Sequence, residues 1–190
     1  MGIVNDNPPK ESLRVIEVTP FRTESVYSDF RRPDEVKWSK TLDEDLKRRD
    51  FTINALAYDL TSGEVIDLFD GRSDLKNKLI RTVGDPNERF GEDALRILRA
   101  IRFAAELNFA IESETVRAIE TKKDLLSQIS KERIKDEFTK IVMSDNPSVA
   151  LGLATQLGLL KYISPELEKG VGIEQNKAHI YTVWEHLIRS

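Results

Sequence analysis

The first third of the chain alternates apolar and polar residues with the short period of β-structure. Residues 13–18 predict a strand, which Pro20 ends. Residues 52–58 and 64–68 predict two further strands, and the Thr-Ser-Gly sequence at 61–63 suits a hairpin turn between them. This part of the chain is therefore expected to be rich in short strands and loops.

A short helix is predicted within this β-rich part, over residues 42–47. Thr41 stands at its N-cap position, and Asp43, Glu44 and Asp45 lie in its first turn. Carboxylates are favoured there because the amino end of a helix carries a partial positive charge.

After Gly84-Asp85-Pro86 the apolar spacing changes to that of helices. The predicted helices span 92–107, 113–122 and 130–142, the last with Ser130 as its N-cap, and Asn146-Pro147 opens a fourth. The fold class is therefore α+β, with a mixed part at 1–84, a helical part at 85–145 and a further helical part at 146–190.

Composition restricts the class of protein. The 190 residues are 39% hydrophobic and 33% charged. They contain no apolar run near the roughly 18–20 residues of a membrane span and no signal-peptide pattern, which favours a cytoplasmic location. The chain has no cysteine, which excludes thiol catalysis and cysteine zinc sites. A net charge of −4 argues against a uniformly basic nucleic-acid binder, although the basic residues occur in clusters.

One cluster with chemical potential is Arg48-Arg49-Asp50-Phe51-Thr52-Ile53-Asn54, where the short helix gives way to a predicted strand. The planar guanidinium of arginine suits phosphate and ribose oxygens. Asparagine can both donate to and accept from a sugar hydroxyl. The alternative is a surface salt-bridge cluster, the usual role of charge runs.

A second cluster is Glu92-Asp93-Ala94-Leu95-Arg96, continued by Arg99 and Arg102. On a helix from residue 92, Asp93 and Arg96 would be surface neighbours. A carboxylate beside a guanidinium pairs with the amino group and ring nitrogen of cytosine or adenine, and leaves mispaired groups against uracil or guanine. An ordinary helix ion pair is the alternative. Base selection requires this pair to lie beside Arg49 and Asn54, away from bulk water.

Three further candidates have weaker signals. Glu17, on the predicted strand, is either a metal-binding carboxylate or an edge-strand surface acid. The run Ser130-Lys-Glu-Arg133-Ile is interpreted mainly as a capped helix start. His179 and His186 can share a helix face, but packing or surface roles are favoured for both.

These motifs form an ordered series that resembles the class II tRNA nucleotidyltransferase family. That family includes bacterial CCA-adding enzymes, their CC- and A-adding relatives, and bacterial poly(A) polymerases. The segments that carry the resemblance occur in this order: Glu17-Val-Thr-Pro-Phe-Arg22, Tyr27-Ser-Asp-Phe-Arg31-Arg-Pro33, Asp45-Leu-Lys-Arg-Arg-Asp-Phe-Thr-Ile-Asn54, Asp67-Leu-Phe-Asp-Gly71, Asp74-Leu-Lys-Asn-Lys, Arg81-Thr-Val-Gly-Asp-Pro86 and Glu92-Asp-Ala-Leu-Arg-Ile-Leu-Arg-Ala-Ile-Arg-Phe103.

The resemblance implies an architecture and a set of partners. Residues 1–84 would be the carboxyl-terminal part of the nucleotidyltransferase head. Residues 85–145 would be the helical neck, and 146–190 the start of a helical body leading to an HD-type domain that the chain lacks. The implied substrates are CTP, ATP and the tRNA 3′ end, with Mg²⁺ as cofactor of the complete enzyme.

The resemblance also implies roles for single residues. Arg49, Asp50 and Asn54 would bind the ribose and phosphates of the incoming nucleotide. Asp93 and Arg96 would act as a protein template for the base of CTP or ATP. Two more arginines of the same helix, Arg99 and Arg102, would lie near phosphates of the nucleotide or the RNA.

One part of the family pattern is missing. Family members carry a glycine-rich loop and then an Asp-x-Asp strand that holds two magnesium ions, and nothing before Glu17 matches it. Glu17 would then be a third carboxylate without its pair. We therefore expect an incomplete enzyme that does not transfer nucleotides alone. A non-catalytic RNA- or nucleotide-binding module of the same fold is the alternative, and CCA, CC-only, A-only and poly(A) addition all fit the motifs.

Overall fold

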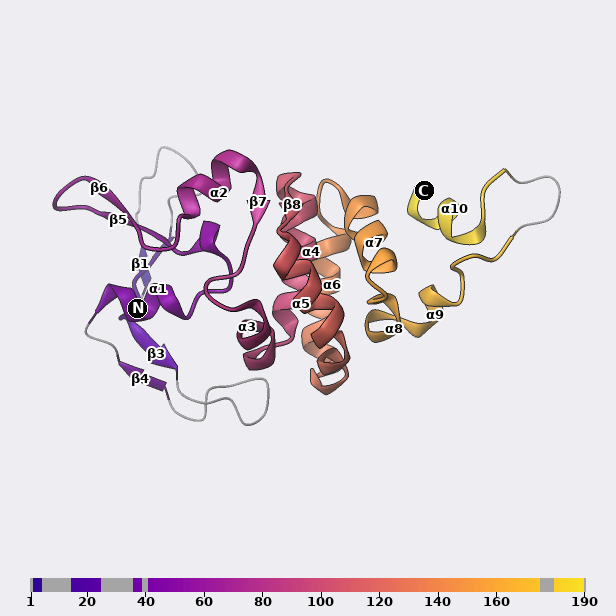
Figure 1. Ribbon diagram of the computed structural model, residues 1–190, viewed down its shortest axis with the longest axis horizontal. Helices are drawn as coiled ribbons and strands as arrows, with labels where there is room; N and C mark the ends of the chain where they lie inside the picture. Colours follow the sequence, from indigo (N-terminus) through magenta and orange to yellow (C-terminus); the bar gives the residue numbers. More distant parts are fainter. Residues whose placement is uncertain (1, 5–14, 25–35, 39–40, 175–179, 190) are drawn as a thin grey trace.

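The computed structural model describes residues 2–4, 15–24, 36–38, 41–174 and 180–189. The chain is elongated (Figure 1). Its first six strands lie at the amino-terminal end, a group of packed helices with the last two strands beside it forms the middle, and the last helix lies at the far end. The α+β class expected from the sequence is confirmed.

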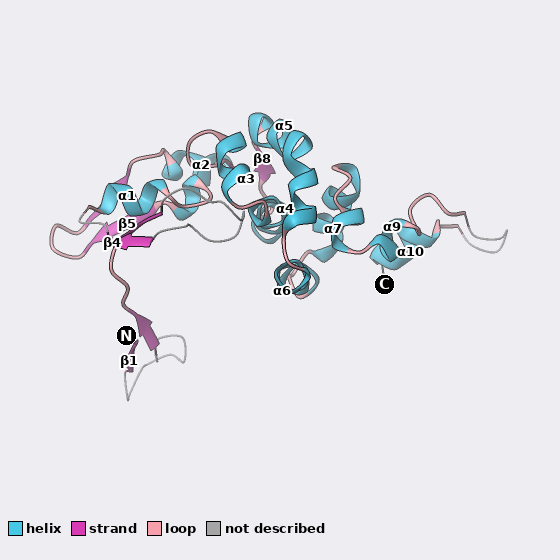
Figure 2. Cartoon of the chain, turned by 90° about the horizontal axis from the view of Figure 1, so that it is seen from below, coloured by secondary structure: helices cyan, strands magenta, loops and turns pink. Residues whose placement is uncertain are grey.

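The first four strands form two antiparallel pairs. Strand β1 (Gly2–Val4) pairs with β2 (Val15–Glu17), and β3 (Arg22–Glu24) pairs with β4 (Val36–Trp38). The β1–β2 pair projects away from the rest of the chain (Figure 2). The strand predicted over 13–18 is present at 15–17, whereas positions 13 and 14 lie outside the described residues.

The hairpin predicted in the head is present, but its first strand starts later than expected. Strand β5 (Leu56–Asp59) pairs with β6 (Glu64–Asp67) in antiparallel register. Thr52–Asn54 is a turn of 3₁₀ helix, η2, where we predicted extended chain. The Asn54 side chain donates to the Asp50 carboxylate at 3.1 Å, and this local bond competes with an extended backbone.

The helix predicted over 42–47 is confirmed as α1 (Leu42–Lys47), although Thr41 makes no side-chain cap bond. Helix α2 (Gly71–Asn77) was not predicted. The Asp67 carboxylate accepts from the backbone N–H groups of Gly71 and Arg72 and so satisfies the start of α2. Glycine is required at 71 because an added Cβ would lie 2.3 Å from the Thr52 carbonyl oxygen.

The long helix predicted over 92–107 is wrong at its start. The structure has two helices there, α3 (Pro86–Glu92) and α4 (Leu95–Leu107). Asp93 separates them with an extended backbone, at φ −147° and ψ 102°. Its carboxylate accepts from Leu95 N at 3.1 Å, so Asp93 acts as a cap and not as a helical residue.

The helices predicted over 113–122 and 130–142 and after Asn146-Pro147 are present as α5 (Ser113–Lys122), α6 (Lys131–Val142) and α7 (Pro147–Gln156). The structure also contains the 3₁₀ helix η3 (Lys123–Gln128) and the short helices α8 (Leu160–Ile163), α9 (Pro165–Glu168) and α10 (Val183–Arg189). Ser130 precedes α6 as predicted but makes no cap bond. Its Oγ is buried without a hydrogen-bond partner among the described residues. Asn146 donates to the Ala105 carbonyl instead of capping α7.

The core is centred on α4, which packs against α6 and α7. Ala94, Leu98, Ile101 and Ala105, which recur at a spacing of three or four residues, are all buried. Phe51, β7 (Leu79–Ile80) and β8 (Ala110–Ile111) join this core, and β7 and β8 pair in parallel. The secondary structure therefore changes near residue 85 while the core continues across the change. Within the described ranges, no helix is both long and apolar enough to cross a membrane.

Candidate nucleotide-binding site

Asp45 organises the end of α1. Its carboxylate accepts from Arg48 Nε at 2.9 Å, from Arg49 Nη2 at 2.9 Å and from the backbone N of Arg22 at 3.2 Å. Burial raises the pKa of Asp45, but the hydrogen bonds outweigh it and hold that pKa below its ordinary value. Arg48 is largely buried in this cluster, whereas the Arg49 side chain is 45% exposed and can reach a ligand.

Asp50 links the segment after α1 to helix α4. Its Oδ2 accepts from Arg99 Nε at 2.7 Å, and its Oδ1 accepts from Asn54 Nδ2 at 3.1 Å. The backbone N–H of Phe51 donates to the same Oδ1. Two of the predicted groups of site residues, 48–54 and 92–102, therefore meet through a direct ion pair.

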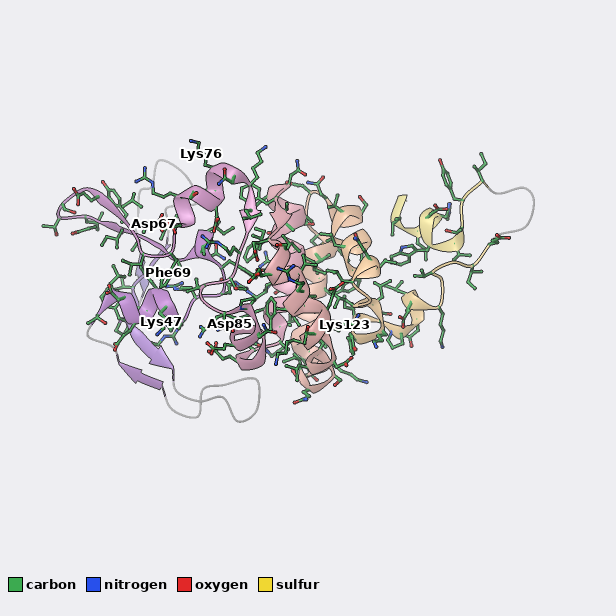
Figure 3. The ribbon with its side chains drawn as sticks, viewed as in Figure 1. Lys47, Asp67, Phe69, Lys76, Asp85 and Lys123 are labelled. Carbon is green, nitrogen blue, oxygen red and sulfur yellow. The ribbon has the colours of Figure 1, made fainter. Side chains whose placement is uncertain are left out.

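Arg96 makes the second link between these groups. Its Nη1 donates to Glu92 Oε2 at 2.6 Å, and its Nη2 donates to the carbonyl of Arg48 at 3.2 Å. Arg89 donates to the neighbouring carbonyl of Lys47 at 3.2 Å. Guanidiniums are favourable at these carbonyls because they lie at the carboxyl end of α1. Figure 3 labels Lys47 at the end of α1 and Asp85 at the start of α3, the two elements that this contact joins.

The expected side-by-side pair of Asp93 and Arg96 is not formed, because Asp93 lies before the helix and not on it. Asp93 is bound by Arg133 of α6, with Nη2 2.7 Å from Oδ2 and Nη1 3.2 Å from Oδ1. Both template candidates are nevertheless largely buried, with side chains 17% and 9% exposed. They do not point into bulk water, and Arg96 contacts the 48–54 segment.

Arg102 is directed toward α6. Its Nε donates to Glu137 at 2.6 Å, and its Nη1 donates to Glu106 at 2.8 Å. Its guanidinium also lies 4.2 Å from the ring centre of Phe103, which forms an edge-on contact with Phe51. The face that carries Arg102 is therefore covered. A phosphate contact for Arg102 stays a prediction.

The other candidates of the sequence analysis contribute little to this site. Glu17 ends strand β2, and its side chain is outside the described residues, as is all of His179. His186 is exposed on α10. Among the residues that the structure describes, no group of three or more His, Cys, Asp or Glu side chains could hold a metal ion.

Sequence reasoning missed two residues of this site. Glu92 was quoted in the motif without a role. The run with Arg133 was interpreted mainly as a capped helix start, and the resemblance likened it to the family motif that braces the neck helices, not to the nucleotide site. A charged residue on the buried side of an amphipathic helix was the available signal for Arg133, since Ile134 and Ile141 mark that side.

Two protein-family models match this chain. The model of the poly(A) polymerase head domain matches residues 4–81, and the model described as a probable RNA- and SrmB-binding site of polymerase A matches residues 108–170. Both models describe parts of RNA nucleotidyltransferases. The template candidates Asp93 and Arg96 lie between the two matched stretches.

Named relatives and solved structures agree with these matches. The CCA-adding enzyme of Enterococcus faecalis is 54% identical over 157 residues, which are 83% of this chain and 38% of that protein. That of Leuconostoc mesenteroides is 47% identical over 178 residues, which are 90% of this chain and 44% of that protein. The Bacillus stearothermophilus CCA-adding enzyme in complex with CTP superposes with a TM-score of 0.75 at 38% identity, covering 90% of this chain and 40% of that one.

A structure with bound RNA also matches. The Thermotoga maritima CCA-adding enzyme complexed with tRNA has a TM-score of 0.62 at 36% identity, and covers 66% of this chain and 32% of that one. The chain belongs to the class II tRNA nucleotidyltransferase and bacterial poly(A) polymerase family. It spans less than half the length of these relatives.

Proposed function

We propose that this chain is the nucleotide-selecting part of a cytoplasmic tRNA 3′-end nucleotidyltransferase that adds C and A from CTP and ATP. The observation that carries the proposal is the junction of its two motifs. The ion pair between Asp50 and Arg99 and the bond from Arg96 to the Arg48 carbonyl join segments about fifty positions apart. The names of the relatives, and solved complexes of such enzymes with CTP and tRNA, support the same assignment.

In this proposal Asp93 and Arg96 read the base. The carboxylate of Asp93 accepts from the amino group of cytosine or adenine, and the guanidinium of Arg96 donates to the adjacent ring nitrogen. Uracil and guanine present a carbonyl oxygen in place of the amino group and an N–H in place of the ring nitrogen. The oxygen would then face the Asp93 carboxylate, two acceptors together, and the N–H would face the Arg96 guanidinium, two donors together. A buried mispaired group costs about 1–3 kcal/mol, enough for a tenfold preference or more.

Arg49 and Asn54 would hold the ribose and phosphates, with Asp50 fixing Asn54 and Arg99. The exposed guanidinium of Arg49 and the amide oxygen of Asn54 are the groups offered to the nucleotide. Release of Arg99 from Asp50 by a phosphate would give a further cation at the same place. These roles are part of the proposal and follow the family resemblance.

Magnesium enters the proposal only through the complete enzyme, where it would promote attack of the RNA 3′-hydroxyl on the α-phosphate. The described residues provide no cluster of metal ligands, so they do not fit a two-metal centre and no step is assigned to the ions. For the same reason we propose that the 190-residue chain by itself binds nucleotides without transferring them.

The test combines transfer and binding on the purified chain. A tRNA that lacks its 3′-terminal CCA is incubated with labelled CTP or ATP and Mg²⁺, and affinities for the four nucleotides are measured by competition. We expect no incorporation, together with binding of CTP and ATP at least about tenfold tighter than UTP and GTP. Robust incorporation would refute the inactivity of the chain. Equal or absent binding of all four nucleotides would refute its role in selection.

A poly(A) polymerase part is the second candidate, because the matching head-domain model carries that name. The same competition measurement separates the two functions. A CCA-adding function requires comparable affinity for CTP and ATP, whereas polyadenylation predicts a preference for ATP over CTP.

A further inference from the structure

One contact reaches the nucleotide site from a residue to which no role in base selection has been given: the two-pronged ion pair, or fork, that Arg133 makes with the Asp93 carboxylate. Its two nitrogens lie 2.7 and 3.2 Å from the two carboxylate oxygens, which is the geometry of a bidentate pair. The residues are 40 positions apart and belong to α6 and to the link before α4. The Arg133 side chain is only 24% exposed, so this is not a surface pair with free rotation.

This fork adds to a local bond that already orients the Asp93 side chain, the one from Leu95 N. Asp93 is in extended conformation between two helices, and its carboxylate has about four acceptor positions. Contacts with the described residues occupy three of them: Leu95 N donates to Oδ1, and the two Arg133 nitrogens donate to Oδ1 and Oδ2. About one acceptor position is then left, on Oδ2, for an amino group from a base.

Helix α6 is itself held in register on α4. Glu137 lies one turn after Arg133 and accepts from Arg102 at 2.6 Å, with a side chain that is 1% exposed. The charges of the two ion pairs are reversed: α6 contributes the positive residue to the pair with Asp93 and the negative residue to the pair with Arg102. A one-turn slip of α6 would bring like charges together, so Arg133 has a fixed position relative to Asp93.

The two halves of the template are therefore positioned from different sides. Arg96 is held by Glu92 and by the Arg48 carbonyl, and Asp93 is held by Arg133. The separation between the carboxylate and the guanidinium then depends on how α6 packs on α4. A protein template discriminates between bases only if this separation matches the spacing of donors and acceptors on a base edge.

We propose that Arg133 is a positioning residue for base selection, which fixes the Asp93 carboxylate so that a single acceptor position faces the nucleotide. The inference rests on the proposed function of Asp93 and Arg96. Arg133 does not touch the nucleotide. Without Arg133, only the bond from Leu95 N holds the carboxylate, so it can turn away from the amino group of cytosine or adenine and the preference for C and A falls.

The test compares Arg133→Gln and Arg133→Lys with Arg117→Gln on the full 190-residue chain. Arg117 is a matched control, because its pair with Glu114 is on the surface of α5, with side chains 65% and 69% exposed. Competition binding with CTP, ATP, UTP and GTP gives the preference for each base, and thermal melting reports stability separately.

We expect Arg133→Gln to weaken the binding of CTP and ATP by about tenfold while the affinities for UTP and GTP change little, so that the discrimination between the two pairs falls by about tenfold. Arg133→Lys keeps the positive charge but cannot form the bidentate pair, so it should retain part of the discrimination. Arg117→Gln should match the wild type. Equal weakening of all four nucleotides, or a lower Tm with discrimination intact, would overturn the inference and leave Arg133 a structural residue. Lack of discrimination by the wild type would refute the proposed function instead.

Discussion

Replacing Glu137 by glutamine should loosen the contact between α6 and α4. The Glu137 carboxylate is 1% exposed and lies 2.6 Å from Nε of Arg102. Burial alone would lower the pKa of Arg102, but the hydrogen bonds to Glu137 and Glu106 raise it above its ordinary value. A guanidinium stays protonated at neutral pH even without such a partner, so Arg102 keeps its charge after the substitution and loses its most buried partner.

The size of the effect follows from this geometry. Breaking a buried ion pair by removing one partner costs about 3–5 kcal/mol. Here Arg102 keeps Glu106 at 2.8 Å, and glutamine keeps the shape and one acceptor oxygen, so we expect about 2–3 kcal/mol. In a protein of this length 1 kcal/mol corresponds to about 2–4 °C, so Tm should fall by about 4–12 °C.

Thermal melting followed by far-UV circular dichroism measures this loss. Glu114→Gln is the matched control, because it makes the same substitution in an exposed pair, which contributes about 0–1 kcal/mol. Adding Arg102→Met to Glu137→Gln should recover part of the loss, since the uncompensated charge is gone. If Glu137→Gln has the same Tm as Glu114→Gln, the buried pair does not hold α6 in place, and our account of the register of α6 is wrong.

Three further predictions concern stability. The lowered pKa of Asp45 means that its contribution is complete above the unfolded-state value of about 3.9 and is lost as pH falls through the lower folded-state value. The Tm of the wild type should therefore fall more steeply with decreasing pH below about pH 4 than the Tm of Asp45→Asn. Asp43→Asn, on the exposed face of α1, should show the same dependence of Tm on pH as the wild type. Gly71→Ala should destabilise by about 1–3 kcal/mol, because its Cβ would overlap the Thr52 carbonyl, and an unchanged Tm would contradict this close approach. Gly152→Ala, in α7 with no atom near its added Cβ, should stabilise by about 0.5–1 kcal/mol.

Local pattern was sufficient for the helices that are amphipathic along their whole length. The predictions for α5 and α6 were confirmed, since apolar residues recur there at helical spacing. It failed at residues 52–54, where side-chain hydrogen bonds and the burial of Phe51 determine the conformation. It also failed at Asp93, which was treated as helical although aspartate readily caps the helix that follows it.

The identity of the residues in the candidate site was easier to predict from the sequence than the contacts between them. The residue types in the two motifs indicated a nucleotide site, and the structure joins those motifs through Asp50 and Arg99. The partner of Asp93 could not be found from spacing, because Arg133 lies 40 positions away and is brought there by the packing of α6 on α4. Long-range ion pairs of this kind depend on tertiary packing and leave little trace in one sequence.

The most direct test of the central claim is nucleotide competition on the wild type, Asp93→Ala and Arg96→Ala. If these two side chains read the base, each alanine variant should lose about tenfold in affinity for CTP and ATP and should approach the wild-type affinity for UTP and GTP. Variants that keep the full wild-type preference for C and A would contradict the assignment of Asp93 and Arg96 as the template.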